Sequence, residues 1–151
     1  MSDNDIIAAR RIKKAFQTLN AAKFLQSGAM YEDVCNKTYY AVYNAIRSVA
    51  GIDDKEFSSH SENIGWYRKE YLKTNIHDRA LSDIITETKA LREGSDYNDE
   101  FEITEDESSH AIEIASEFCE YINEYIQLRI SKYLEKGMPF QPRSKQSTLN
   151  I

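Results

Sequence analysis

The sequence predicts an all-α protein, an up-and-down bundle of four main helices and one short helix. Three observations lead to this fold class. Apolar side chains recur at steps of three and four along most of the 151-residue chain, which is the spacing of one face of an α-helix. Both prolines, Pro139 and Pro142, follow residue 138, so proline interrupts no earlier segment. The glycines, apart from Gly65, are spaced like helix ends.

The first two helices are expected to form an antiparallel pair. The first should begin with a cap at Asp3 or Asn4 and end near Gly28. The second should run from about Tyr31 to Gly51, and the link between the two is so short that they must be neighbours. Two apolar rows lie side by side along the second helix, so it should contact more than one partner and form the centre of the bundle.

The remaining helices lie in the second half of the chain. A short one is expected within residues 63–73. A longer one should follow a cap at Asn75 or Asp78 and end at or just after Gly94.

The longest helix opens after an acidic link, where Thr104 and Glu107 have the spacing of a capping box. We expect the bundle to occupy residues 1–137. Residues 138–151 hold both prolines and no acidic side chain, and they are expected to form a flexible C-terminal tail.

Charge and cysteine usage narrow the classes of function. The net charge of −6 disfavours broad, non-specific binding to nucleic acid, which needs clustered Lys and Arg. Four cations within residues 10–14 and ten acids within residues 98–128 fit oppositely charged surfaces of packed helices. Cys35 and Cys119 lie in apolar rows, as buried thiols of a reducing compartment do. With no signal peptide and no apolar run long enough for a bilayer, a cytoplasmic protein without membrane attachment is expected.

Several kinds of catalytic site find no support in the sequence. Glu107 and His110 form a single Glu-x-x-His pair, whereas di-metal bundles carry two such pairs and two further glutamates. Neither cysteine has a histidine nearby in the sequence, and no glycine-rich phosphate loop occurs. We therefore expect no metal site and no cofactor.

Two stretches carry polar groups suited to binding. Tyr39, Tyr40 and Tyr43 crowd one part of the central helix, where their hydroxyls either are satisfied within the core or line the edge of a cleft. Arg92 and Asp96 are four residues apart and share a face if their helix extends beyond its glycine. The arginine is suited to holding a phosphate, and the plainer alternative is a surface salt bridge.

These features together resemble the HEPN domain family (higher eukaryotes and prokaryotes nucleotide-binding), and its small stand-alone prokaryotic branch in particular. The resemblance covers about 5–125 and rests on the order and spacing of residues 36–45 (Asn-Lys-Thr-Tyr-Tyr-Ala-Val-Tyr-Asn-Ala), His60, Leu91-Arg92 and Asp96-Tyr97, before the capping box and the last amphipathic helix. It implies a bundle of four to five helices that forms a homodimer with a cleft between protomers. It also implies a role in toxin–antitoxin or phage-defence systems, beside a minimal nucleotidyltransferase that acts as the antitoxin.

The nuclease signature of active family members is only half present. That signature is an arginine, four residues and a histidine; Arg92 matches the arginine, but Tyr97 stands in the histidine position. Tyrosine, with a pKa of about 10, does not titrate where a general acid or base is needed. The resemblance leaves Arg92, Asp96, Tyr97 and His60 as candidate catalytic residues. It places the candidate nucleotide- or RNA-binding residues on the central helix, at Lys37, Tyr39, Tyr40, Tyr43, Asn44 and Arg47.

Three functions follow from these residues. We favour a nucleotide- or RNA-binding module that acts with a nucleotidyltransferase partner. The first alternative is an active, metal-independent RNase that uses Arg92 with Asp96 or His60. The second is a non-catalytic adaptor that dimerises and recruits a partner through its basic, proline-bearing tail.

Overall fold

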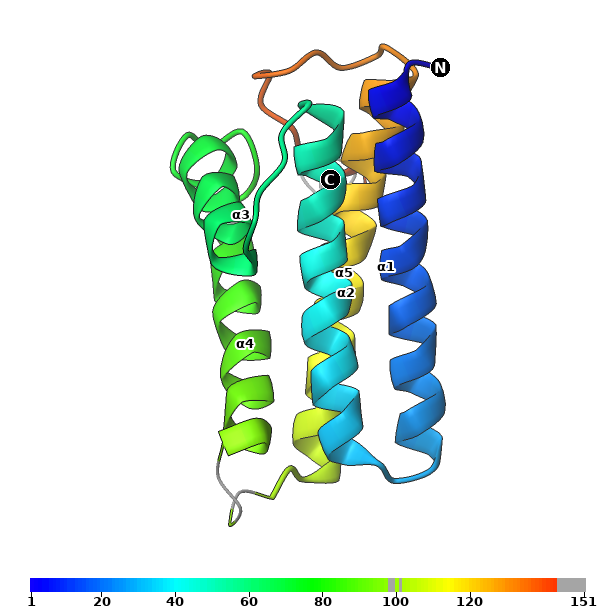
Figure 1. Ribbon diagram of the computed structural model, residues 1–151, viewed down its shortest axis with the longest axis vertical. Coiled ribbons are helices and arrows are strands. Elements are labelled where there is room, and N and C mark those ends of the chain that lie inside the picture. The colour runs from blue at the N-terminus through cyan, green and yellow to red at the C-terminus, as the bar shows by residue number, and fades with distance from the viewer. Residues whose placement is uncertain (98–99, 101, 144–151) are drawn as a thin grey trace, which may run out of the picture.

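The computed structural model is an all-α bundle, as predicted, with no β-strand in the part of the chain that it describes. It describes residues 1–97, 100 and 102–143, and of residues 95–97 the backbone alone. In chain order the elements are α1 (Asp3–Ser27), α2 (Tyr31–Ile52), α3 (His60–Tyr67), η1 (Arg68–Leu72), α4 (Leu81–Tyr97) and α5 (Glu105–Ile130). Helices α1 and α4 run in one direction and α2 and α5 in the other, which gives the up-and-down order (Figure 1).

Helix α2 occupies the centre of the bundle. It contacts α1, α3, α4 and α5, and in Figure 1 α1 lies on one side of it and the α3–α4 pair on the other. Every residue from 41 to 52 except Arg47 is buried. The two apolar rows predicted for this helix therefore face several neighbours, and each large side chain buried here contributes roughly 1.5–3 kcal/mol to stability.

The predicted start of α5 is confirmed, whereas the cap of α1 differs from the predicted one. The Thr104 hydroxyl accepts a hydrogen bond from the Glu107 amide, and the Glu107 carboxylate accepts one from the Thr104 amide, both at 3.1 Å, which is the predicted capping box. Helix α1 has an equivalent box between Ser2 and Asp5. Its cap is therefore Ser2, which precedes both predicted positions.

Two helices differ from their predicted bounds. Helix α4 continues through Gly94 to Tyr97. The short helix begins at His60, before the predicted residues 63–73, because the Ser59 hydroxyl caps it by accepting a hydrogen bond from the Glu62 amide at 3.2 Å. It then continues into the π-helical turn η1.

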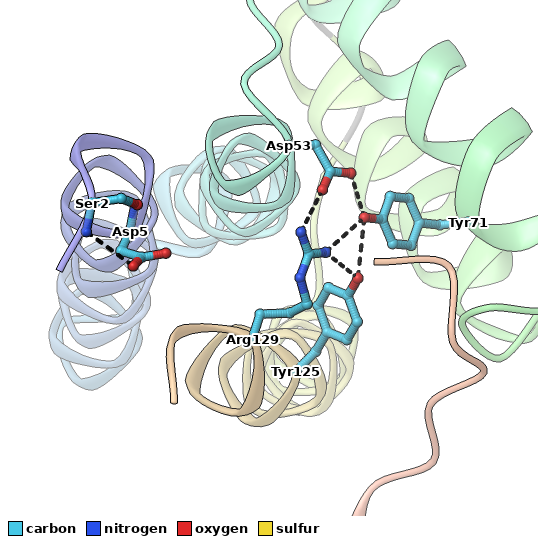
Figure 2. A network of polar contacts seen from close by, with 6 residues as sticks. All are labelled: Ser2, Asp5, Asp53, Tyr71, Tyr125 and Arg129. Carbon is cyan, nitrogen blue, oxygen red and sulfur yellow. Dashed lines mark hydrogen bonds and ion pairs between the residues drawn. The ribbon is translucent and has the colours of Figure 1, made fainter. Parts of the chain in front are cut away.

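A buried ion pair joins the end of α2 to α5 (Figure 2). Arg129 Nη2 lies 2.9 Å from Asp53 Oδ1, and the two side chains are 10% and 0% exposed. The Tyr71 hydroxyl donates to the other oxygen of the same carboxylate, and Arg129 Nη1 donates to the Tyr125 hydroxyl at 2.6 Å. The Tyr125 hydroxyl in turn donates to Tyr71 at 3.1 Å. The buried charges are thus paired and hydrogen-bonded, as burial of charge requires.

The chain after α5 folds back onto the bundle through Phe140. This residue is buried; its amide donates to the Ile76 carbonyl at 2.9 Å, and its carbonyl accepts from the Tyr121 hydroxyl at 3.1 Å. Its ring lies beside the fully buried imidazole of His77, with 6.0 Å between ring centroids. Burial, together with the charge of Arg129, lowers the pKa of His77 to about 3, so this histidine is a neutral member of the core.

Two predictions about the chain as a whole stay predictions. Phe140 and Pro142 are buried, so the packed part reaches beyond residue 137, but residues 144–151 lie outside the described residues. The division into bundle and flexible tail is therefore untested. Within the described residues, no helix combines the length and the apolar character that crossing a lipid bilayer requires. The predicted cytoplasmic location stays a prediction.

Removing one member of the buried ion pair should destabilise the protein strongly. The Arg129→Met variant should lose about 3–5 kcal/mol of unfolding free energy, because Asp53 would remain as an unpaired buried charge. Urea unfolding measures this loss, and Arg10→Met, at an exposed position of α1, is the matched control. The double variant Asp53→Leu, Arg129→Met should recover most of the stability. A double variant as unstable as Arg129→Met alone would contradict the stated cause.

Candidate functional site

Three tyrosines of α2 form a joined aromatic surface. The rings of Tyr39 and Tyr43, one helical turn apart, are stacked with 6.5 Å between centroids and 8° between planes. Tyr40 meets Tyr39 edge-on at 5.2 Å. Tyr39 and Tyr43 are 4% and 9% exposed, whereas Tyr40 is only partly buried. Two of the predicted binding tyrosines are therefore largely enclosed, and the third is accessible.

Arg92 reaches this aromatic surface from α4. Its Cζ atom lies 4.9 Å from the ring centroid of Tyr39 and 5.3 Å from that of Tyr40. These are cation–π distances, and such contacts contribute about 0.5–2 kcal/mol depending on exposure. The packing of α4 against α2 thus brings together an arginine and two tyrosines that are far apart in the sequence.

His60, the first residue of α3, lies against the same tyrosines. Its ring centroid is 3.9 Å from that of Tyr43, and its Nδ1 atom is 3.4 Å from the Tyr39 hydroxyl. Burial lowers the pKa of His60, and the positive charges of Arg92 and Arg47 lower it further. The imidazole is therefore held toward its neutral form.

We call this group the Arg92 cluster; its members are Arg92, His60, Tyr39, Tyr40 and Tyr43. Guanidinium N–H groups bind phosphate oxygens, and aromatic rings stack with nucleobases. The neutral imidazole can accept a proton. Burial raises the pKa of Tyr39 although Arg92 opposes this shift, so the phenol stays protonated. The cluster is therefore suited to holding a phosphate and to general-base chemistry at its histidine.

Comparison with known protein families matches residues 8–125 to the HEPN domain. The chain belongs to the HEPN domain family. A Methanocaldococcus jannaschii protein named "putative toxin" is 26% identical to it over 126 residues, which cover 83% of this chain and 84% of that protein. A UPF0332 protein of Thermotoga maritima is 23% identical over 127 residues, which cover 84% of this chain and 96% of that protein. The resemblance identified from the sequence is thereby confirmed.

The second half of the HEPN nuclease signature is only partly described. Because α4 continues to Tyr97, Asp96 lies one turn beyond Arg92 on the same face of the helix. The side chains of Asp96 and Tyr97 lie outside the described residues. Their catalytic roles therefore stay predictions.

The other predicted binding residues share one face of α2 with Tyr40. They are Lys37, Asn44 and Arg47, which are separated from Tyr40 and from one another by steps of three and four. Asn44 is only 5% exposed, whereas Lys37 and Arg47 are partly buried and remain accessible. The charge of Arg47 extends to the Arg92 cluster, since it helps to lower the pKa of His60.

The structure also places the residues considered for other chemistries. His110 Nε2 lies 3.4 Å from Glu87 Oε1, with both side chains about half exposed. The described residues contain no group of three or more His, Cys, Asp or Glu side chains that could hold a metal ion. Burial raises the pKa of Cys35 to about 11 and that of Cys119 to about 12, so both thiols stay protonated at neutral pH.

Sequence reasoning missed Arg11, Lys55 and Asn63. Together with Arg47 and Tyr43 they lie around a cavity of about 140 Å³ next to the Arg92 cluster. The sequence signals only Arg11, through the run of cations on α1. That run predicts a charged helix surface and does not indicate a contact with α2 or with the segment after it.

Neutralising Arg92 should raise the pKa of His60, because one of the charges that disfavour the imidazolium would be lost. An NMR titration of the His60 imidazole in the Arg92→Gln variant measures this shift. Lys89→Gln removes a cation from an exposed position of the same helix and should leave the pKa of His60 unchanged. If the titration curve of Arg92→Gln matches that of the wild type, Arg92 does not lie beside His60 in solution.

Proposed function

We propose that this HEPN domain binds RNA or a nucleotide at the Arg92 cluster and acts in a toxin–antitoxin or defence system. One observation carries the proposal: the guanidinium of Arg92 lies over Tyr39 and Tyr40, and its charge acts on His60. Four of the five groups in this cluster come from α2 and α4, and the fifth, His60, comes from α3. All three helices hold residues on which the family resemblance rests.

The arrangement favours a phosphate that carries a base. A guanidinium placed over aromatic rings still offers N–H donors to a phosphate, and its planar fork suits two phosphate oxygens at once. Tyr40 and His60 are more exposed than the other two tyrosines, so they offer ring faces on which a base can stack. Single-stranded RNA presents unstacked bases and phosphates together, which is the combination that such a site recognises.

The relatives support the biological part of the proposal. The Methanocaldococcus jannaschii relative carries the name "putative toxin", and we extend a toxin role to this chain. Two further parts of the proposal rest on the family resemblance. They are a homodimer with the cluster at the cleft between its protomers, and a minimal nucleotidyltransferase as the antitoxin partner.

An active RNase is a second candidate function because of where His60 lies. Tyr97 replaces the signature histidine, but α3 brings His60 close enough to Arg92 for that charge to alter its pKa. In RNA cleavage the neutral imidazole would take the proton of the 2′-hydroxyl, and the 2′-oxygen would attack the phosphorus and expel the 5′-oxygen, which would take a proton from water. Arg92 would stabilise negative charge on the phosphate. Asp96, one turn beyond Arg92, is the other candidate base.

Replacing Arg92 with alanine should weaken binding of a fluorescently labelled single-stranded RNA by about tenfold or more. The reason is that a hydrogen bond to a charged group contributes about 1.5–3 kcal/mol. Fluorescence anisotropy at one fixed, low salt concentration measures the affinity. Lys89→Ala removes an exposed cation of the same helix and should bind nearly like the wild type. Equal, weak binding by the wild type and Arg92→Ala would remove the Arg92 cluster as the binding site.

The same RNA, followed on a denaturing gel with and without a chelator, separates the two candidate functions. Cleavage that survives the chelator and is lost in both Arg92→Ala and His60→Ala indicates a metal-independent RNase. Binding that depends on Arg92, without cleavage, indicates the binding module. Cleavage that persists in Arg92→Ala would end the RNase assignment.

A further inference from the structure

The polar cavity next to the Arg92 cluster lies where α1, the end of α2 and α3 meet. We call it the Arg11 pocket. Its volume is about 140 Å³, and it is lined by Arg11, Tyr43, Arg47, Lys55, Glu56, Phe57 and Asn63. Three of these side chains are cations and one is a carboxylate, so the pocket is positively charged. An anion is the ligand that its charge favours.

Arg11 and Arg47 converge on this pocket in spite of their like charges. Arg11 Nη1 donates a hydrogen bond to the Arg47 carbonyl at 3.0 Å, which fixes its guanidinium against the last turns of α2. Burial lowers the pKa of Arg11, and the charge of Arg47 lowers it further. Glu56 Oε1 lies 4.0 Å from Arg11 Nη2, on a side chain that is 87% exposed. An ion pair at the surface contributes little to stability.

The close approach of Arg11 to α2 depends on Gly51. A Cβ atom at this position would lie 2.9 Å from Ile7 Cγ2 and 3.2 Å from Arg11 Nη1. Glycine inside a helix costs roughly 0.5–1 kcal/mol relative to alanine. Here it leaves the space in which the Arg11 side chain packs, so the pocket is a built feature of the α1–α2 contact.

Asn63 supplies a second, independent indication of a ligand. The residue is only 4% exposed, it lines the pocket, and its Oδ1 atom has no hydrogen-bond partner among the described residues. A buried acceptor without a partner costs about 1–3 kcal/mol. The oxygen is shielded from solvent, so the side-chain amide must turn toward the pocket for a ligand hydroxyl group beside the anionic group to satisfy it.

Tyr43 connects the Arg11 pocket with the Arg92 cluster. It lines the pocket, and its ring lies 3.9 Å from that of His60 between centroids. Arg47 also takes part in both, since it lines the pocket and lowers the pKa of His60. A single extended ligand can therefore contact both.

We propose that the Arg11 pocket binds one ribose-phosphate unit of an RNA strand, with the phosphate on Arg11 and Arg47 and the ribose 2′-hydroxyl donating to Asn63 Oδ1. This inference rests on the proposed function, because the same strand continues past Tyr43 to the Arg92 cluster. The 2′-hydroxyl is the group that distinguishes RNA from DNA. The pocket thus makes the site selective for RNA.

The test uses two probes small enough to occupy the pocket alone, ribose 5-phosphate and 2-deoxyribose 5-phosphate. NMR titration of the full chain follows the backbone amides of Gly51, Lys55 and Asn63. Ribose 5-phosphate should bind about tenfold more tightly, because the deoxy sugar leaves Asn63 Oδ1 without its donor.

Matched variants test which residues bind the phosphate of the probe and which residue binds its sugar. Arg11→Gln should weaken both probes by about tenfold or more, whereas Arg10→Gln, one residue away and exposed, should bind them like the wild type. Asn63→Leu keeps a similar side-chain size and should abolish the preference for ribose while the phosphate still binds. Lys55→Ala, at an exposed position, should weaken both probes and serves if Arg11→Gln does not fold.

Equal affinity of the wild type for the two probes would overturn the proposal, and so would a ribose preference that persists in Asn63→Leu. Arg92→Ala separates the pocket from the proposed function, since it should keep both small probes and lose the longer RNA. If ribose 5-phosphate binds but no RNA binds through Arg92, the proposed function alone fails. If RNA binds through Arg92 and ribose 5-phosphate does not bind, the pocket alone fails.

Discussion

The nearly complete burial of α2 is the constraint on which the rest of the structure depends. A helix that is enclosed on most of its faces leaves few positions where a side chain can reach solvent, and Tyr40 and Arg47 occupy two of them. Because α1, α3 and α4 pack against this helix, side chains from each of them meet over its surface. Arg92 arrives from α4, Arg11 from α1 and His60 from α3. The packing that stabilises the fold therefore also sets the geometry of the Arg92 cluster and of the Arg11 pocket.

The distribution of charge over the surface matters more here than the net charge. The chain as a whole carries −6, yet Arg11, Arg47 and Lys55 line one pocket, and Arg92 lies over the neighbouring tyrosines of α2. Burial lowers the pKa of His60, and the positive charges of Arg92 and Arg47 lower it further. The acids of residues 98–128 fall largely on α5 and its approach. This distribution of charge would attract a polyanion to one region and repel it from another, as the proposed RNA-binding function requires.

Local patterns in the sequence predict the helices, and they fail where distant residues meet. Apolar periodicity identifies α2, and the Thr104 capping box marks the start of α5. Both are recognisable because the residues that make up each signal lie within a few positions of one another along the chain. The family resemblance predicts Arg92, His60 and the tyrosines as site residues, but not which of them lie in contact. The position of His60 against the tyrosines could not be predicted, because the cap that starts α3 at Ser59 was not recognised. The Arg11 pocket and the Asp53–Arg129 pair join residues from different helices, and no spacing along the chain encodes them.

Gly51 has a consequence for how related chains can vary. The volume that a methyl group would take at this position is already filled by Ile7 and Arg11. A homologue with alanine here must change the side chain at position 7, and to a lesser extent that at position 11, or move the two helices apart, so these positions should change together with position 51 in evolution. Such covariation would trace the arginine's role through sequences alone, independently of any ligand.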